Sequence, residues 1–80
     1  MNVKQKLTSI FIEMLGVEEN ELHEDATIRN DLGADSLDFI ELVMKTEFEF
    51  NIQVPDEAMD NIKTFGDFVE YVRIKTGEND

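Results

Sequence analysis

Apolar residues recur at three- and four-residue steps along most of this chain, and this spacing limits its fold more than any other feature. An α-helix turns once in about 3.6 residues, so such steps place apolar side chains on one face of a helix. The pattern predicts a first helix ending at Gly16, a second over 36–50, a short third over 56–61 and a last one ending at Gly77. Because strand-like alternation is nearly absent, we expect an all-α fold, a small four-helix bundle with three longer helices and one short one.

The connection between the first two helices, residues 17–35, interrupts this periodicity. Four of its residues are placed to reach the core: Leu22, Ala26, Ile28 and Leu32. A loop of this length in a small domain is usually functional or contains a short helical turn. No repeat, low-complexity tract or domain boundary is visible, so we expect residues 1–80 to form a single domain. We also expect this domain to be monomeric.

Charge and cysteine content exclude several functions. The chain has 19 acidic and 7 basic residues, a net charge of −12, and no cysteine. This charge disfavours nucleic acids and anionic membranes as partners and favours basic protein surfaces. No apolar run is long enough to span a membrane, and the amino-terminal segment lacks a signal-peptide pattern, so we expect a cytoplasmic protein. Without cysteine there is no disulfide, thiolate metal site or cysteine nucleophile, and any thiol chemistry needs a borrowed thiol.

The helix predicted over 36–50 has two apolar faces. One face suits the core and contains Phe39, Leu42, Val43, Thr46 and Phe50. The opposite face contains Leu37, Met44 and Phe48, with Ile40 beside them. Either the helix is central and covered on both sides, or the second face docks a partner.

The charge around the second face favours docking. Residues 35–60 carry eight acids and one base, a net charge of 1 − 8 = −7. The acids that flank the second face are Asp38, Glu41, Glu47 and Glu49. An apolar stripe rimmed by acids is complementary to an apolar groove rimmed by bases.

The segment DLGADSLD, residues 31–38, opens this helix. Gly33 allows a tight turn, Asp35 can cap the helix, and Ser36 falls in the first turn with its hydroxyl outward. A helix amino terminus favours a phosphate because its free N–H groups carry partial positive charge. Taken alone, however, a serine at this position is most simply part of a cap.

This segment, together with ELVM at 41–44, an acidic stretch ending at Phe50 and VPDE at 54–57, resembles the acyl carrier proteins of fatty acid synthesis. The resemblance covers most of the chain. It implies a helical bundle whose Ser36 bears a phosphopantetheine arm, derived from coenzyme A and joined through a phosphodiester. The thiol of such an arm carries growing acyl chains as thioesters. The resemblance therefore implies a carrier without catalytic activity or a metal of its own, loaded by a phosphopantetheinyl transferase and serving fatty acid synthesis enzymes.

The resemblance also implies roles for residues near Ser36. Docking onto basic patches of partner enzymes is implied for Asp35, Leu37, Asp38, Ile40, Glu41, Met44 and Glu47. Among these, Asp35 resembles the aspartate that joins the metal site of the modifying transferase. Candidates to line a space that shelters the acyl chain are Phe39, Leu42, Val43, Thr46 and Ile62. Phe39, Thr46 and Phe48 depart from the commonest family pattern, which leaves chain-length capacity and partner choice open.

Rival functions fit the residues less well. An esterase would need a base beside Ser36, but the one histidine is His23 in the loop, and GADSLD is not a G-x-S-x-G elbow. A calcium loop beginning at Asp31 would have Ser36 instead of Gly at position six and Leu42 instead of Glu at position twelve. A nucleic-acid mimic would explain the acidity but not DLGADSLD. The alternative that stays open is a specialised carrier of polyketide, aminoacyl or other thioester-bound intermediates.

Overall fold

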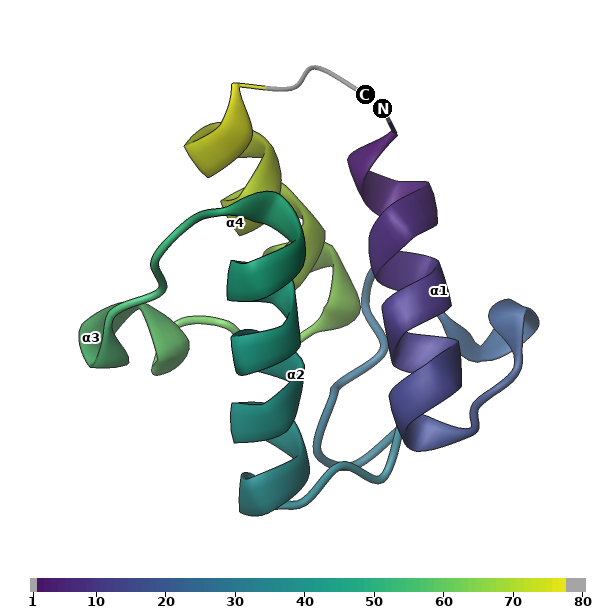
Figure 1. Cartoon of the computed structure of the whole chain (residues 1–80). Helices are drawn as coiled ribbons and strands as arrows, with labels where there is room; N and C mark the ends of the chain where they lie inside the picture. Colours follow the sequence, from purple (N-terminus) through teal and green to yellow (C-terminus); the bar gives the residue numbers. More distant parts are fainter. Residues whose placement is uncertain (1, 78–80) are drawn as a thin grey trace.

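The computed structural model describes residues 2–77 and shows a helical bundle (Figure 1). Its elements in chain order are α1 (Val3–Leu15), the 3₁₀ turn η1 (Glu19–Glu21), α2 (Ser36–Phe50), α3 (Asp56–Met59) and α4 (Phe65–Thr76). Within residues 2–77 no strand forms, and the one β-type contact is an isolated bridge between Thr27 and Thr64. The predicted all-α architecture, the helix over 36–50 and the helical turn inside the long loop are confirmed.

One helix is shorter than predicted. α3 ends at Met59, two residues before the expected boundary at Asn61. Beyond Met59 the backbone tightens, because the N–H of Asn61 bonds to the carbonyl of Ala58 and the N–H of Ile62 to that of Met59. These bonds span three residues instead of four, so the segment continues as a turn.

The long helices begin and end where their local chemistry dictates. The Asn2 side chain accepts a hydrogen bond from the N–H of Gln5 at 2.8 Å and caps α1. α1 stops at Gly16, whose φ of 71° is the left-handed conformation that glycine adopts without steric cost. α4 is opened by a reciprocal capping box between Thr64 and Asp67.

The core lies between α1, α2 and α4 and is built around three aromatic rings. Phe11 of α1 meets Phe65 and Phe68 of α4 edge to face, with ring centroids 5.0 and 5.4 Å apart. All three side chains are fully buried. α2 adds three buried side chains from its predicted core face, Leu42, Val43 and Thr46.

The long loop packs against this core and is fastened to the start of α4. The four residues predicted to point inward, Leu22, Ala26, Ile28 and Leu32, are all buried, and Ala34 is buried as well. The N–H of Phe65 bonds to the carbonyl of Ala26, and the N–H of Ile28 bonds to the carbonyl of Lys63, both at 2.9 Å. The loop before α2 therefore has a defined path.

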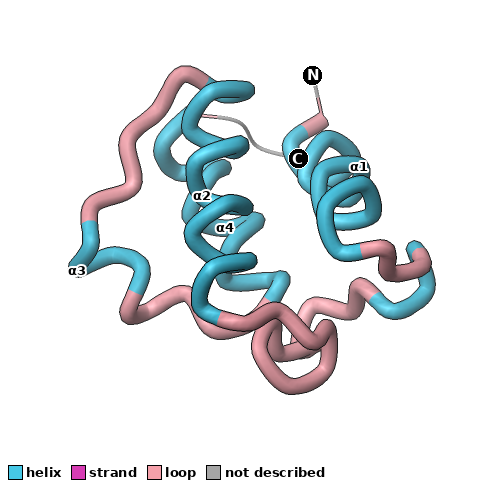
Figure 2. Tube along the Cα trace, turned by 60° about the horizontal axis from the view of Figure 1, so that its bottom comes forward, coloured by secondary structure: helices cyan, strands magenta, loops and turns pink. Residues whose placement is uncertain are grey.

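α3 stands apart from this arrangement. In the views of Figure 1 and Figure 2 it lies on the side of α2 away from α1. None of its four residues is fully buried. Over residues 2–77, none of the helices combines the length and apolar character that a membrane crossing requires.

Candidate functional site at the start of α2

A capping box fixes the first turn of α2. The Asp35 carboxylate accepts a hydrogen bond from the N–H of Asp38 at 2.8 Å, and the Asp38 carboxylate accepts one from the N–H of Asp35 at 3.1 Å. Ser36, the first helical residue, is exposed and takes no part in this box. Since Asp35 is the cap, the hydroxyl of Ser36 remains available for chemistry.

The Ser36 hydroxyl has a partner that the sequence did not reveal. Arg29 reaches across from the long loop, and its Nη2 donates a hydrogen bond to Ser36 Oγ at 2.8 Å. No local pattern identifies this pair, because it joins an irregular loop to a helix end. His23, the residue an esterase would have needed as its base, is exposed in the loop, and Ser36 bonds to Arg29 instead.

The loop that presents Arg29 and Ser36 is held by its own hydrogen bonds. Thr27 and Asp31 form a reciprocal pair in which each backbone N–H donates to the side chain of the other, at 2.9 and 3.0 Å. The N–H of Ala34 donates to the carbonyl of Ile28 at 3.0 Å. Gly33 has a φ of 74°, so the tight turn expected there requires the conformation that glycine favours.

The start of α2 fits a phosphodiester on Ser36. The N–H groups of Ser36 and Leu37 make no hydrogen bond to any residue in the range 2–77, as is usual for the first turn of a helix. These N–H groups, the positive end of the helix and the Arg29 guanidinium all favour an anion at Oγ. Within the described chain no group of acidic or histidine side chains is arranged to hold a metal ion.

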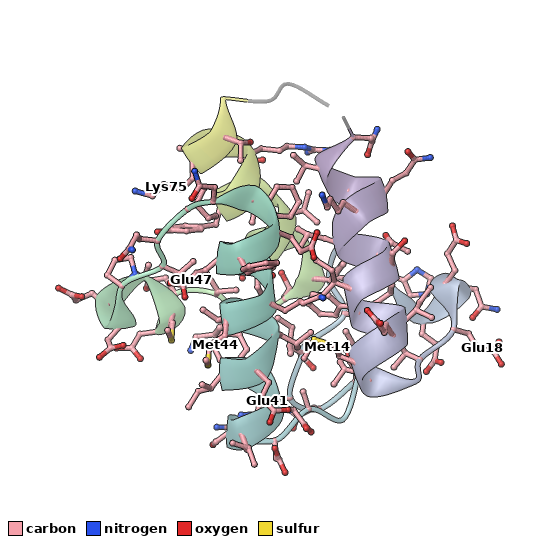
Figure 3. The ribbon with its side chains drawn as sticks, viewed as in Figure 1. Met14, Glu18, Glu41, Met44, Glu47 and Lys75 are labelled. Atoms are coloured by element: carbon pink, nitrogen blue, oxygen red, sulfur yellow. The ribbon has the colours of Figure 1, made fainter. Side chains whose placement is uncertain are left out.

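The second apolar face of α2 is open. Met44 is 62% exposed and Phe48 is 82% exposed, with Leu37 and Ile40 exposed as well. The long loop packs elsewhere, so the alternative of a helix covered on both sides is wrong. Figure 3 shows Met44 between Glu41 and Glu47 along this face of α2.

The acids around this face have different surroundings. Glu41 is exposed, and its carboxylate makes no hydrogen bond or ion pair with any residue of 2–77. The Glu47 carboxylate accepts a hydrogen bond from the N–H of Val54 at 2.8 Å, which joins α2 to the loop before α3. Asp38 belongs to the capping box.

Glu49 does not belong to the free acidic rim that the sequence predicted. Its carboxylate lies 3.3 Å from Nζ of Lys6 in α1 and 3.4 Å from Nζ of Lys45. The hydrogen bond with Lys6, and to a smaller extent the one with Lys45, lower the pKa of Glu49 below its ordinary value. The approach of α1, which is a tertiary feature, turns this carboxylate toward the bundle.

A cavity of about 710 Å³ opens beside Ser36, between α2, α3 and the long loop. Two of the five predicted acyl-chain residues, Phe39 and Ile62, line it. The other three, Leu42, Val43 and Thr46, are fully buried in the core and are not part of its wall. Ile40 and Met59 add apolar lining that the sequence did not assign.

Comparison with known proteins gives the family of the chain. The pattern of the family described as "Phosphopantetheine attachment site" matches residues 5–72. An acyl carrier protein of Prochlorococcus marinus (strain MIT 9515) is 49% identical over 75 residues, which cover 94% of each chain. The match contains DLGADSLD and every long helix in whole or in large part. The chain therefore belongs to the family of acyl carrier proteins, and its sequence contains the phosphopantetheine attachment site of that family.

Proposed function

We propose that this chain carries acyl groups for the enzymes of fatty acid synthesis on a phosphopantetheine arm attached to Ser36. The observation that carries the proposal is an exposed serine hydroxyl at the first position of α2, which is not needed for capping because Asp35 caps the helix. When bound, the arm supplies the terminal thiol on which acyl groups travel as thioesters. A chain without cysteine has no such group of its own.

The residues around Ser36 prepare it for modification. The box between Asp35 and Asp38 orders the first turn, so the hydroxyl stands at one position on the surface. The free N–H groups of Ser36 and Leu37 favour the negative charge that a phosphodiester brings. Asp35 is next to the hydroxyl and exposed, where a transferase can reach its carboxylate.

The open face of α2 is the surface on which we expect partner enzymes to dock. Leu37, Ile40 and Met44 offer exposed apolar contact area along one side of the helix. Glu41 offers beside them a negative charge that has no ion-pair partner among residues 2–77. Basic side chains around an apolar groove would be steered toward this face and would fit it. The partly buried Glu47 adds charge but also fastens the loop before α3.

The cavity beside Ser36 is the space in which an attached acyl chain can shelter. Phe39, Ile40, Met59 and Ile62 give it apolar walls next to the attachment point. Its volume of about 710 Å³ is in the range of small-molecule sites. The buried Thr46 donates its hydroxyl to the carbonyl of Leu42 at 2.8 Å, so it is satisfied within the core and does not face this space.

Mass spectrometry of the intact protein tests the attachment. Incubation with coenzyme A and a phosphopantetheinyl transferase should add one arm to the wild type and none to Ser36→Ala. The chain offers a matched control, Ser9→Ala, which removes the only other serine, an exposed residue of α1, and should load like the wild type. Loading of Ser36→Ala, or none on the wild type, would refute the assignment. A second assay separates this role from that of a specialised carrier. Reconstituted fatty acid synthesis enzymes should elongate an acyl chain bound to the arm of this protein, whereas a specialised carrier would receive the arm but would not support elongation.

A further inference from the structure

We propose that Arg29 binds the phosphate of the arm once Ser36 is loaded, and so restrains the arm at its root. This inference rests on the proposed attachment to Ser36. It assigns a phosphate-binding role to a loop residue outside DLGADSLD.

The first support is the position of the guanidinium. Arg29 Nη2 already lies at hydrogen-bond distance, 2.8 Å, from Ser36 Oγ, the atom to which the phosphorus becomes bonded. Esterification removes the hydroxyl proton and places anionic oxygens next to Oγ. A guanidinium at this position can exchange one bond to a neutral hydroxyl for charge-assisted bonds to the phosphate, which its forked donors match.

The second support is the charge balance. The chain has 19 acids for 7 bases, yet Arg29 forms no ion pair with any carboxylate of residues 2–77. Lys6, Lys45 and Arg73, by contrast, pair with acids. Lys63 lines the same cavity as Arg29 and Ser36, so two of the seven bases meet there. Asp56 and Asp60 line it from the α3 side, and neither pairs with Arg29.

The third support is the anchoring of the backbone on both sides of Arg29. Ile28 is buried, and its N–H bonds to the carbonyl of Lys63 while its carbonyl accepts from Ala34. The Thr27–Asp31 pair closes the loop around Arg29. The backbone of Arg29 is therefore held in a defined position. Binding of a phosphate then loses little conformational entropy from ordering the loop.

NMR spectroscopy of the loaded protein tests the inference without any enzymatic readout. Four proteins are compared: the wild type, Arg29→Gln, Arg29→Lys and the control Lys4→Gln. The control also removes one positive charge from an exposed position, but on α1. Loading should shift the side-chain N–H signals of Arg29 in the wild type. The phosphorus signal should have the same chemical shift and linewidth in the wild type and in the Lys4→Gln control. In Arg29→Gln its chemical shift should change and its line should narrow, because the phosphate is no longer restrained. In Arg29→Lys the signal should lie between those of the wild type and Arg29→Gln.

Two results keep this inference separate from the proposed function. Mass spectra showing one arm on all four proteins establish that loading succeeded. If loading is then complete but the Arg29 signals do not respond to it and the phosphorus signal of Arg29→Gln equals that of Lys4→Gln, the role of Arg29 is refuted while attachment stands. Absence of loading on the wild type refutes the attachment itself. The backbone spectrum of Arg29→Gln checks its fold, and if that variant does not fold, the wild-type shift and Arg29→Lys decide.

Discussion

Replacing Asp67 by alanine should loosen the fastening between the site-bearing loop and α4. The Asp67 carboxylate accepts hydrogen bonds from the backbone N–H groups of Lys63 at 3.0 Å and Thr64 at 3.1 Å. These are the residues to which the loop is attached, through the bridge between Thr27 and Thr64 and the bond from Ile28 to Lys63. Asp67→Ala removes Oδ2, the oxygen that accepts both bonds, while keeping the N–H of residue 67, the donor to the Thr64 hydroxyl.

The size of the effect follows from the two lost bonds. A hydrogen bond contributes a net of about 1 kcal/mol, and a helix cap typically about as much. Asp67 is largely exposed, so solvent screens its charge, and we expect a loss of about 1 to 2 kcal/mol in the free energy of unfolding. For a domain of this size that lowers the melting temperature by roughly 4 to 16 °C.

The effect should depend on pH with a defined sign. The backbone hydrogen bond from Lys63 is the main cause that holds the pKa of Asp67 below its ordinary value of 3.8. A carboxyl group whose pKa is lower in the folded state stabilises the fold above its unfolded pKa. The difference between the wild type and Asp67→Ala should therefore be complete above about pH 5 and shrink as the pH falls through the folded pKa.

Urea unfolding followed by circular dichroism measures this difference across the pH range. Glu70→Ala is the matched control, because it removes one carboxylate from the same helix and its one ion pair, to Arg73, is long at 4.0 Å. The control should stay within about 0.5 kcal/mol of the wild type. Equal stability of Asp67→Ala and Glu70→Ala at neutral pH would refute the capping argument. A difference between them that persists undiminished at low pH would refute its electrostatic part.

Two further substitutions test the open face of α2 and the close packing of the long loop against the start of α4. Glu41→Lys should weaken binding to a phosphopantetheinyl transferase about fivefold, equivalent to about 1 kcal/mol, and this loss of affinity should become smaller as salt is added. The control Glu13→Lys, on the exposed side of α1, should bind like the wild type. Equal affinities of the two variants in a binding titration would place the docking surface elsewhere. Gly66→Ala should lower the free energy of unfolding by about 1 to 3 kcal/mol, since the Cβ of the new alanine would lie 2.7 Å from the carbonyl oxygen of Glu24. Helix propensity alone would instead make the alanine variant the more stable protein. Urea unfolding that finds the variant as stable as the wild type would therefore contradict the predicted clash.

The parts of the fold that sequence reasoning predicted are those set by local chemistry. The bounds of α2 follow from the Asp35 cap and an uninterrupted helical pattern, and its two apolar faces follow from the helical repeat. The same local reasoning indicates that Ser36 lies inside the first turn, because the capping residue Asp35 directly precedes it. The length of α3 was less accessible, since a one-turn helix differs from a turn by single hydrogen bonds.

The parts that were not predicted depend on contacts between elements. The bond from Arg29 to Ser36 joins a loop to a helix, and no spacing rule describes it. The pairing of Glu49 with Lys6 depends on how closely α1 approaches α2. A helical wheel assigns Leu42 and Phe39 to one face, but only the position of α3 decides which of them reaches the cavity.

The marginal attachment of α3 has a mechanical consequence. Three walls of the bundle are stiff, because α1, α2 and α4 all contribute fully buried side chains to one core. α3 has no fully buried residue and no side-chain cap, and only its Ala58 and Met59 pack partly against the core, so displacing it exposes less apolar surface than displacing a long helix. The molecule thus combines a rigid frame with one compliant wall, and its internal space can change volume at a small cost in free energy while the frame keeps its shape.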